Sequence, residues 1–323
     1  MSIDLDRREL LKTAAAVAAA ALATTSSSQD LSAQETPDTL HFFPAGFKHD
    51  RVKTSGAEIN VVRGGDGPPL LLIHGAPYSH VSWYKVAPDF AKDHTVIMPD
   101  LRGYGDSSKS PDTKDHANYS KRNMALDMVE VMQHYGYNRF PVVGHDRGGR
   151  VGHRLALDHQ DKVTHLTVLD IVPTYYLYTH VTLEFVQAYY HWFHQLRPSP
   201  APENEIFEQN KRAKERATDP IQIEFLRTSS TMENIHAMCE DYRASASIDL
   251  ELDAADMKAA KKIQCPLLTL WAASGAMGKL YDVLAIWKDE GVEVSGKGLP
   301  GNHSLQESAP KETLAEIQKF LKA

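Results

Sequence analysis

Short apolar runs of β-forming residues alternate with amphipathic helical stretches along most of this chain. The runs are EINVVRG, PLLLIHG, TVIMPD, FPVVGHD, THLTVLDIV and, much later, PLLTLWAA. Such alternation is typical of βαβ units, in which parallel strands form a sheet that helices cover on both faces. The chain has 323 residues, of which 42% are hydrophobic, so it is long enough to bury one large core. We therefore expect an α/β fold with a mostly parallel central sheet.

The segment at 173–252 interrupts this alternation. It is rich in Tyr, Trp, His and charged residues, contains the proline-rich stretch RPSPAPEN, and shows helical patterns without a convincing strand. An insertion of this kind predicts a helical cap that closes over the carboxyl ends of the strands, where open α/β sheets bind their ligands. We expect the sheet core at 34–172 and 253–323, and the cap at 173–252.

The composition argues against several classes of protein. The formal net charge is −7 and no long basic run occurs, which argues against nucleic-acid binding. No Cys/His cluster has metal-ligand spacing, so we expect neither a metal nor another cofactor. Cys265 opens an apolar run and Cys239 lies in a polar helical segment, so we expect two free thiols rather than a disulfide.

Residues 1–33 have the organisation of an export signal. Arg7 and Arg8 precede a short apolar stretch at 13–23, which is followed by a polar Ser/Thr tail. This order is typical of a twin-arginine secretory signal, with cleavage after about residue 23 or 33. The apolar stretch is too short to span a bilayer, so we expect periplasmic export without a stable membrane anchor. The alternative is an N-terminal segment, disordered or amphipathic, that has no targeting role.

The stretch PVVGHDRGGR follows a buried run and contains the outline of a strand-to-helix turn. In the pattern G-x-S-x-G, such a turn holds a catalytic serine in a strained position, and its glycines let the strand and the helix pass closely. Here the pattern reads Gly144-His145-Asp146-Arg147-Gly148, with aspartate at the serine position. We predict that Asp146 is a carboxylate nucleophile; the alternative is that it only caps the following helix.

A nucleophile at this turn needs a base, an acid that orients the base, and donors for an oxyanion. His303, in the loop GLPGNHSLQE after the last apolar run, is predicted to be the base. Asp170 ends the run THLTVLD and is predicted to orient the base, because Asp282 lies too far beyond its own strand. A plain helix cap is the alternative for Asp170. The backbone N–H groups of Ala76 and Arg147 are predicted to form the oxyanion hole.

Several longer motifs carry a family resemblance. They are HGAPYSHVSW, PDLRGYGDSS, VVGHDRGGRVGHRLALDH, LDIVPT, YYHWF, CEDYRASASIDLELD and GNHSLQESAP. From about His49 to the C-terminus, the chain resembles the fluoroacetate (haloacetate) dehalogenases of the α/β-hydrolase fold. The most specific motif is H-D-R-G-x-R followed by L-D-I-V-P-T, since most relatives with aspartate at this turn have tryptophan after it. An export signal is not expected of this family.

The resemblance implies a two-step hydrolysis of a haloacid. Asp146 would attack the halogen-bearing carbon and form an ester, and His303, held by Asp170, would activate the water that hydrolyses it. The substrate is itself a carboxylate, and two negative charges about 4 Å apart repel by roughly 4 kcal/mol at an effective dielectric constant near 20. Arg147 and Arg150 are expected to bind the substrate carboxylate and offset that repulsion. The alternative for Arg150 is an i,i+4 ion pair with Asp146.

The resemblance also implies donors for the departing halide. These are His191 and Trp192 in YYHWF and Tyr242 in CEDYRA, each with an N–H or O–H on an aromatic body that excludes water. The alternative is that this aromatic cluster only packs in the core. Members of the family tend to have phenylalanine at the position of Ala76, so we expect a wider pocket in this chain.

Two other functions remain open from the sequence. An epoxide hydrolase uses the same aspartate and histidine chemistry and needs two cap tyrosines, for which Tyr242 with Tyr189 or Tyr190 are candidates. A non-catalytic ligand receptor on this fold is the alternative from a different class. The partner that we expect is a small haloacid substrate, and a homodimer is compatible with a cap-bearing fold.

Overall fold

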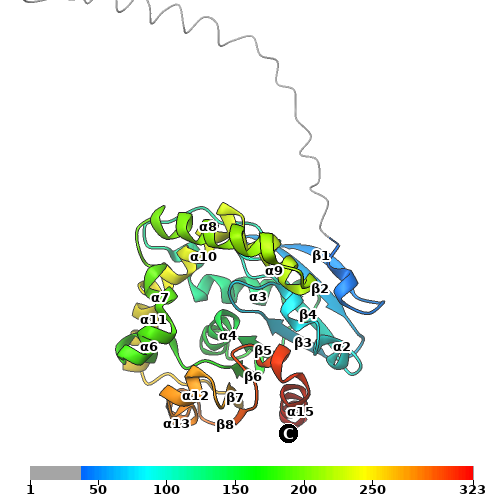
Figure 1. The fold of residues 1–323 in the computed structure, drawn as a ribbon. Coiled ribbons are helices and arrows are strands. Elements are labelled where there is room, and N and C mark those ends of the chain that lie inside the picture. The colour runs from blue at the N-terminus through cyan, green and yellow to red at the C-terminus, as the bar shows by residue number, and fades with distance from the viewer. Residues whose placement is uncertain (1–37, 323) are drawn as a thin grey trace, which may run out of the picture. The chain divides into compact units, whose positions relative to one another are not determined.

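The computed structural model describes residues 38–322, and the predicted export signal at 1–33 lies outside them. The described chain forms a sheet in the order β1-β2-β4-β3-β5-β6-β7-β8 (Figure 1). The strands are β1 (Lys48–Lys53), β2 (Glu58–Gly64), β3 (Pro69–Ile73), β4 (Thr95–Pro99), β5 (Phe140–His145), β6 (Val163–Leu169), β7 (Leu267–Ala272) and β8 (Val294–Leu299). Neighbours from β4 to β8 in this order are parallel, whereas β1 pairs antiparallel with β2, and β2 with β4. The predicted α/β fold with a mostly parallel sheet is confirmed.

The strands that the apolar runs predicted all lie between two neighbours in the sheet. Leu70 to Ile73 of β3, for example, have no exposed surface, as expected of a parallel strand that is buried on both faces. The runs did not predict β1 and β8, which are the two edge strands. Their sequences, KHDRVK and VSGKGL, leave much of each strand at least partly exposed. An edge strand has only one neighbour and needs no continuous apolar run, which explains why the pattern missed both.

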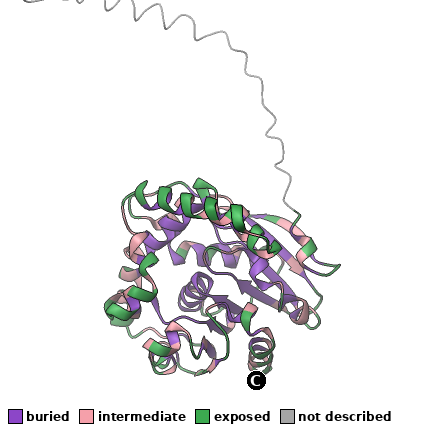
Figure 2. Ribbon diagram, in the orientation of Figure 1, coloured by how far each residue is buried: buried purple, intermediate pink, exposed green. Residues whose placement is uncertain are grey.

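Helices cover both faces of the sheet and bury two sets of apolar side chains. They are α2 (Ala87–Phe90), α3 (Lys121–His134), α4 (Arg147–Asp158), α13 (Val283–Lys288) and α15 (Pro310–Leu321). Leu71 and Ile73 of β3 pack with side chains of α3, α4 and α13, whereas Leu70 and Leu72 pack with α2 and α15. Successive side chains of a strand point to opposite faces, so one apolar run supplies both layers. Figure 2 shows the inner strands and α4 as largely buried.

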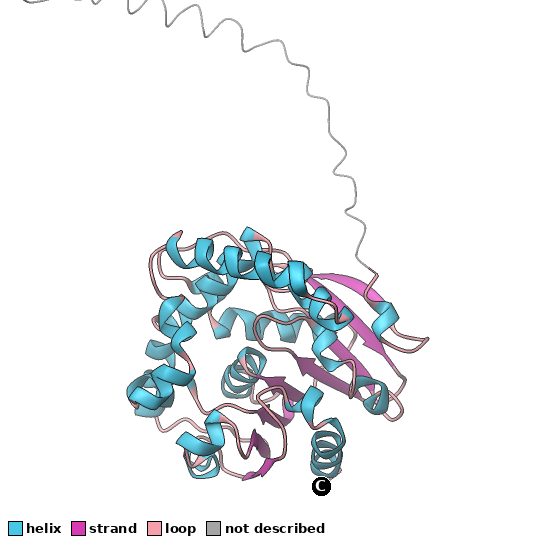
Figure 3. Cartoon of the chain, viewed as in Figure 1, coloured by secondary structure: helices cyan, strands magenta, loops and turns pink. Residues whose placement is uncertain are grey.

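The segment between β6 and β7 is helical (Figure 3). Its helices are α5 (Thr174–Thr179), α6 (Leu183–Ala188), α7 (Tyr190–His194), α8 (Ala201–Arg216), α9 (Pro220–Ser229), α10 (Met232–Ser245) and α11 (Ile248–Lys258). The last of these continues past residue 252, where the sequence analysis placed the end of the cap, because the stretch LELDAADMK has no helix breaker. The remaining short elements are η1 (Leu40–Phe42), η2 (His80–Trp83), η3 (Ala117–Tyr119), α12 (Ala276–Leu280) and α14 (Leu305–Ser308).

Both cysteines are free thiols, as expected from the sequence. Cys239 is buried in α10, and Cys265 is half-buried just before β7. Burial raises the pKa of the Cys239 thiol to about 12 and that of Cys265 to about 11, so neither is a reactive thiolate at neutral pH. Within residues 38–322, no helix has both the length and the apolar character needed to cross a membrane.

Candidate active site

Asp146 lies in the sharp turn between β5 and α4. Its backbone has a φ of 48°, a left-handed conformation that a residue with a side chain rarely adopts and that costs about 1–3 kcal/mol. The neighbouring glycines make the turn possible. A Cβ on Gly144 would overlap the backbone of Gly148, and a Cβ on Gly148 would overlap the carbonyl of Ile73 in β3. The turn therefore holds the carboxylate at the carboxyl end of the sheet, and Asp146 is only 5% exposed.

His303 and Asp170 reach Asp146 from the neighbouring strand ends. Asp170 follows β6 directly, and His303 lies in the loop between β8 and α14. His303 donates Nδ1–H to Asp170 Oδ2 at 2.7 Å, and its Nε2 lies 3.7 Å from Asp146 Oδ2. Asp170 Oδ1 accepts the backbone N–H of Ala272 at 2.8 Å, which fixes the carboxylate. The structure thus brings the three predicted catalytic side chains together, because parallel strands end at one edge of the sheet.

The charges in this group depend on one another. Burial alone would lower the pKa of His303, but its contacts with Asp146 and Asp170 outweigh burial and raise that pKa to about 10. Burial alone would raise the pKa of Asp146, yet the adjoining His303, together with His145 and Arg147, holds it well below its usual range. At neutral pH this group therefore contains an ionised Asp146 beside a protonated His303.

The two oxygens of Asp146 have different surroundings. Oδ1 accepts the backbone N–H of Ala76 at 3.1 Å, in the turn after β3, as predicted for an oxyanion hole. Arg147 begins α4, and N–H groups in the first turn of a helix have no acceptor within that helix. Oδ2 faces His303. The two carboxylate oxygens are therefore not equivalent: Oδ1 is hydrogen-bonded to the backbone, and Oδ2 lies beside the imidazole.

Arg147 is held by a carboxylate that the sequence analysis missed. Its Nε and Nη2 donate to Asp241 Oδ2 and Oδ1 at 2.9 and 2.7 Å. Nη1 is buried and has no hydrogen-bond partner among the described residues. The predicted role in binding a substrate carboxylate therefore rests on one nitrogen rather than on the whole guanidinium. Asp241 stands beside Tyr242 in the motif CEDYRA, but nothing in the local sequence indicates that it pairs with Arg147.

Arg150 has a similar unmet donor. Its Nη1 donates to the carbonyl of Val172 and to Thr174 Oγ1, both at 3.0 Å, whereas its buried Nε has no partner in the described chain. No ion pair between Arg150 and Asp146 occurs among the described residues, so the i,i+4 alternative is not what the structure contains. Burial and the charge of Arg147 lower the pKa of Arg150 to about 10, which still leaves it a cation at neutral pH.

The aromatic residues predicted to bind a halide differ in their exposure. Trp192 is buried against Arg150, whose guanidinium lies 4.6 Å from the ring centroid, and its Nε1 has no partner in the described chain. Tyr242 is buried with its ring 4.1 Å from the guanidinium of Arg147. His191 is exposed, with its ring 6.0 Å from that of Tyr242. Trp192 and Tyr242 thus join the arginines, while His191 lies at a more open position.

Comparisons with known proteins identify the fold and the family of this chain. A family model described as the alpha/beta hydrolase fold matches residues 68–233. A fluoroacetate dehalogenase from Burkholderia sp is 41% identical over 288 residues, which cover 85% of this chain and 94% of that protein. The chain belongs to the fluoroacetate dehalogenase family of the α/β-hydrolase fold.

Two further likenesses bear on this family member. A solved structure from Nostoc sp PCC 7120, described as an alpha/beta hydrolase, is 49% identical with a TM-score of 0.81. The match covers 85% of this chain and 98% of that one. A soluble epoxide hydrolase from Corynebacterium sp. (strain C12) is 43% identical over 125 residues, which cover 39% of this chain and 42% of that protein.

In this dehalogenase-family chain, Asp241 of the cap helix α10 forms ion pairs and a hydrogen bond with residues of the core. Besides Arg147 of α4, it contacts Lys121 Nζ of α3 and accepts the hydroxyl of Tyr104 at 2.6 Å. Burial would raise the pKa of Asp241, but Arg147 and Lys121 lower it to about 2. Asp241 is therefore an anion with two buried cations, and it fixes the direction in which the free nitrogen of Arg147 points.

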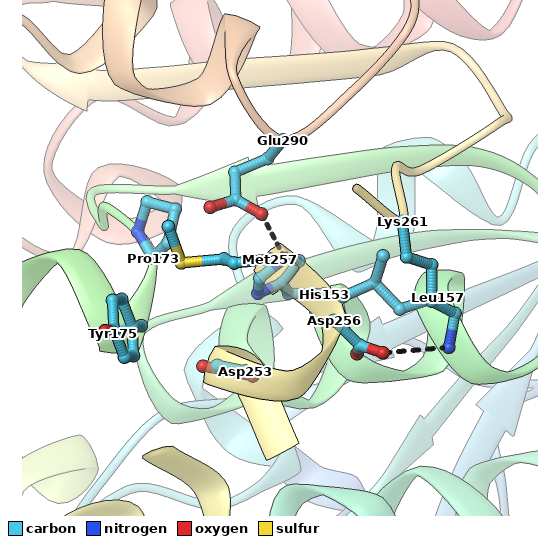
Figure 4. Close-up of a pocket in the computed structure, with 9 residues that line it drawn as sticks. All are labelled: His153, Leu157, Pro173, Tyr175, Asp253, Asp256, Met257, Lys261 and Glu290. Atoms are coloured by element: carbon cyan, nitrogen blue, oxygen red, sulfur yellow. Dashed lines mark ion pairs between the residues drawn. The ribbon is translucent and has the colours of Figure 1, made fainter. Parts of the chain in front are cut away.

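Two clusters outside this group do not contribute to it. Asp112, His236 and Glu240 lie close enough to share a metal ion, but His236 and Asp112 already hydrogen-bond, and Glu240 accepts from Arg243 at 2.8 Å. They form an ion-pair network that runs from the exposed Asp112 to the buried Glu240. A small cavity, of about 10 Å³, is lined by His153 and Leu157 of α4 and by Glu290. Figure 4 shows its lining residues and the ion pair of His153 and Glu290. The volume of this cavity would hold about one water molecule and no organic substrate.

Proposed function

We propose that this protein is a hydrolase that converts haloacetates, such as fluoroacetate and chloroacetate, into glycolate and halide. One observation carries the proposal: at least three buried donors that have no partner among the described residues, Arg147 Nη1, Arg150 Nε and Trp192 Nε1, belong to one cluster beside Asp146. Buried polar groups are normally hydrogen-bonded, so unmet donors in a site mark the place of a ligand. Two cations and an indole N–H suit a small anion that also carries an electronegative leaving group.

The first step forms an ester. Asp146 Oδ2 attacks the carbon that bears the halogen, the carbon–halogen bond breaks, and the halide leaves with the bonding electrons. Arg147 and Arg150 hold the substrate carboxylate next to the attacking carboxylate, a pair of charges that would otherwise repel by roughly 4 kcal/mol. Trp192 and Tyr242 donate to the halide as its charge develops. Their aromatic rings exclude water from the site.

The second step depends on a charge that the first step removes. The negative charge of Asp146 contributes to the high pKa of His303, and esterification neutralises that charge. The pKa of His303 then falls, so the imidazole can lose its proton and become a base for water. Water attacks the carbonyl of the ester, the oxyanion on Oδ1 is held by the N–H groups of Ala76 and Arg147, and glycolate leaves. Asp170 keeps Nδ1–H of His303 in place throughout.

The covalent intermediate supplies the test. We expect His303→Asn to complete the first step and stop before the second, because the base acts only in hydrolysis. Intact-mass analysis after incubation with chloroacetate should then show a carboxymethyl adduct, and peptide mapping should place it on Asp146. The matched control, Asp146→Asn combined with His303→Asn, should show none. An adduct on another residue, or full turnover by His303→Asn, would refute the mechanism.

The second candidate is an epoxide hydrolase, and the partial likeness to the Corynebacterium protein favours it. Of the tyrosines considered for epoxide protonation, Tyr242 is buried, Tyr189 lies 6.3 Å from the His303 ring, and Tyr190 is 60% exposed. A neutral epoxide would leave the unmet donors of Arg147 and Arg150 without a partner. Incubation with styrene oxide separates the two candidates: diol formation without halide release from haloacetates would overturn the proposal.

A further inference from the structure

A cavity of about 290 Å³ adjoins the catalytic residues on the cap side. Its walls come from α7, α8 and α10 and from the turn that follows β3. Ala76 in that turn lines the cavity and donates its N–H to Asp146 Oδ1, and Tyr242, which also lines the cavity, lies against Arg147. The cavity therefore begins where a substrate bound to these residues would lie.

The side chains around the cavity leave room for an organic group. Ala76 contributes only a methyl group, while Ile206 and Met238 form an apolar wall and are 9% and 7% exposed. Gln195 is 6% exposed, and its Oε1 is buried without a hydrogen-bond partner in the described chain. A haloacetate carries only hydrogens in the remaining positions on C2. A bound haloacetate would therefore contact neither the apolar wall nor the Oε1 of Gln195.

The chemistry of attack decides which bond of C2 can face the cavity. The carboxylate is directed at Arg147 and Arg150, the halide at Trp192 and Tyr242, and the nucleophile approaches opposite the halide. Only the two hydrogens of C2 remain. They lie on opposite sides of the plane through the carboxylate carbon, C2 and the halide, so one of them at most can point toward Ala76 and the cavity.

We propose, on the basis of the dehalogenase function above, that the cavity binds a substituent on C2 of the substrate. The substrates then include 2-halo carboxylic acids that carry an alkyl group of about two to four carbon atoms on C2. Asp146 displaces the halide from C2 with inversion and forms an ester. Water then breaks the bond between the acyl carbon of Asp146 and the ester oxygen. The products are a 2-hydroxy acid, a halide ion and a proton, and no oxidant or reductant takes part. Only one enantiomer can place its chain in the cavity.

The wild-type enzyme gives the first test. Chloride release from chloroacetate should be compared with release from each enantiomer of 2-chlorobutanoate and 2-chlorohexanoate. We expect one enantiomer of each longer acid to reach a kcat/KM within about tenfold of that of chloroacetate, because contact of its methylenes with the apolar wall offsets the slower displacement at a substituted carbon. The other enantiomer should be at least about a hundredfold slower. Chiral chromatography should show the inverted 2-hydroxy acid.

A filled cavity gives the second test. Ile206→Phe narrows the cavity, and Ile223→Phe is the matched control because Ile223 is 43% exposed on α9 and does not line the cavity. Ile206→Phe should lower kcat/KM for 2-chlorohexanoate by at least about tenfold and leave chloroacetate within about twofold, whereas the control should leave both unchanged. Thermal unfolding of both variants shows whether they fold. If Ile206→Phe does not fold, the wild-type comparison decides.

The possible outcomes separate this inference from the function on which it rests. Turnover of chloroacetate with both enantiomers of the longer acids more than about a thousandfold slower would refute the subsite and leave the dehalogenase intact. Equal slowing of all substrates by Ile206→Phe would also refute it, because the cavity would then be an entrance. No halide from any acid would refute the proposed function itself.

Discussion

The residue that determines the chemistry at this site is Asp146, because its charge sets the state of the residues around it. Its carboxylate is buried in a strained turn and is balanced by a protonated His303 in the free enzyme. In a serine-type site the same turn would present a neutral hydroxyl, and the histidine would have to take its proton before attack. With aspartate, attack needs no base. In the proposed mechanism, the histidine therefore acts only after the ester has formed.

The first prediction at this scale concerns the link between Asp146 and His303. The folded pKa of His303, about 10, exceeds its ordinary value of 6.5, so its contribution to stability is present below about pH 6.5 and is lost as pH rises through 10. Asp146→Asn removes one of the two carboxylates, and the pKa should fall toward the ordinary value. An NMR titration of the His303 ring protons measures it. An unchanged pKa would show that Asp170 alone holds the proton.

The second prediction concerns the leaving group. Trp192→Phe keeps most of the packing against Arg150 and removes the unpaired Nε1–H. Fluoride concentrates charge and is a poorer leaving group than chloride, so loss of a donor should slow fluoroacetate hydrolysis by about a hundredfold, as for a single oxyanion-hole contact, and chloroacetate hydrolysis by less. Steady-state kcat values for both substrates give the comparison. Equal losses would mean that Trp192 only shapes the pocket.

At the scale of elements, α10 is the helix that connects the cap to the chemistry. It supplies Tyr242 to the site and Asp241 to the buried cations of α3 and α4. Arg147 therefore depends on the cap for its orientation, although it belongs to the core. The ion pair is also costly to break, since removing one partner of a buried pair leaves an uncompensated charge and destabilises a protein by about 3–5 kcal/mol.

Asp241→Asn tests this dependence. We expect lower stability in urea and a KM for chloroacetate raised about tenfold, with a smaller change in kcat, because Arg147 would no longer be held toward the substrate. The pKa of Asp241 is about 2 in the fold and ordinarily 3.8, so its stabilisation is present above about pH 4 and is lost as pH falls toward 2.

The matched control for Asp241→Asn is Asp253→Asn. Asp253 of α11 forms an ion pair with Arg154 of α4, away from the catalytic residues, and Arg154 keeps Asp158 and Asp256 as partners. This variant should lose some stability and retain its KM. A normal KM in Asp241→Asn would show that Asp241 is only structural.

At the scale of the whole molecule, the N-terminal sequence predicts export to the periplasm, and the described residues do not test this prediction. Residues 1–33 precede the first described element, and the export signal stays a prediction from the sequence. A homodimer likewise stays a prediction. The twin-arginine route carries folded proteins, so residues 38–322 should be active on their own if the signal is removed.

Arg7→Lys combined with Arg8→Lys tests the location. The change should keep the protein in the cytoplasm and leave the activity of the purified protein unchanged, because the signal lies apart from the catalytic residues in sequence. Cell fractionation followed by immunoblotting measures the distribution. Normal amounts of the variant in the periplasm would contradict a twin-arginine signal.

The sequence by itself determined the inner strands and the turn at Asp146. Apolar runs and glycine spacing are local patterns, so EINVVRG and PVVGHDRGGR could be interpreted without knowledge of the fold. His303 and Asp170 also followed from their order along the chain, because the ends of parallel strands meet at one edge. The sequence did not predict the edge strands β1 and β8, since a strand with a single neighbour needs no continuous apolar run.

Only the tertiary structure decided which donors are free. Asp241 pairs with Arg147 across 94 positions of sequence, and no local pattern records a contact between such distant residues. The same holds for the carbonyl of Val172, which accepts from Arg150, and for Gln195, whose Oε1 lacks a partner within residues 38–322. An arginine or an amide in a motif shows that a donor or acceptor exists. Whether it is available to a ligand depends on which other groups the fold has placed within hydrogen-bonding distance.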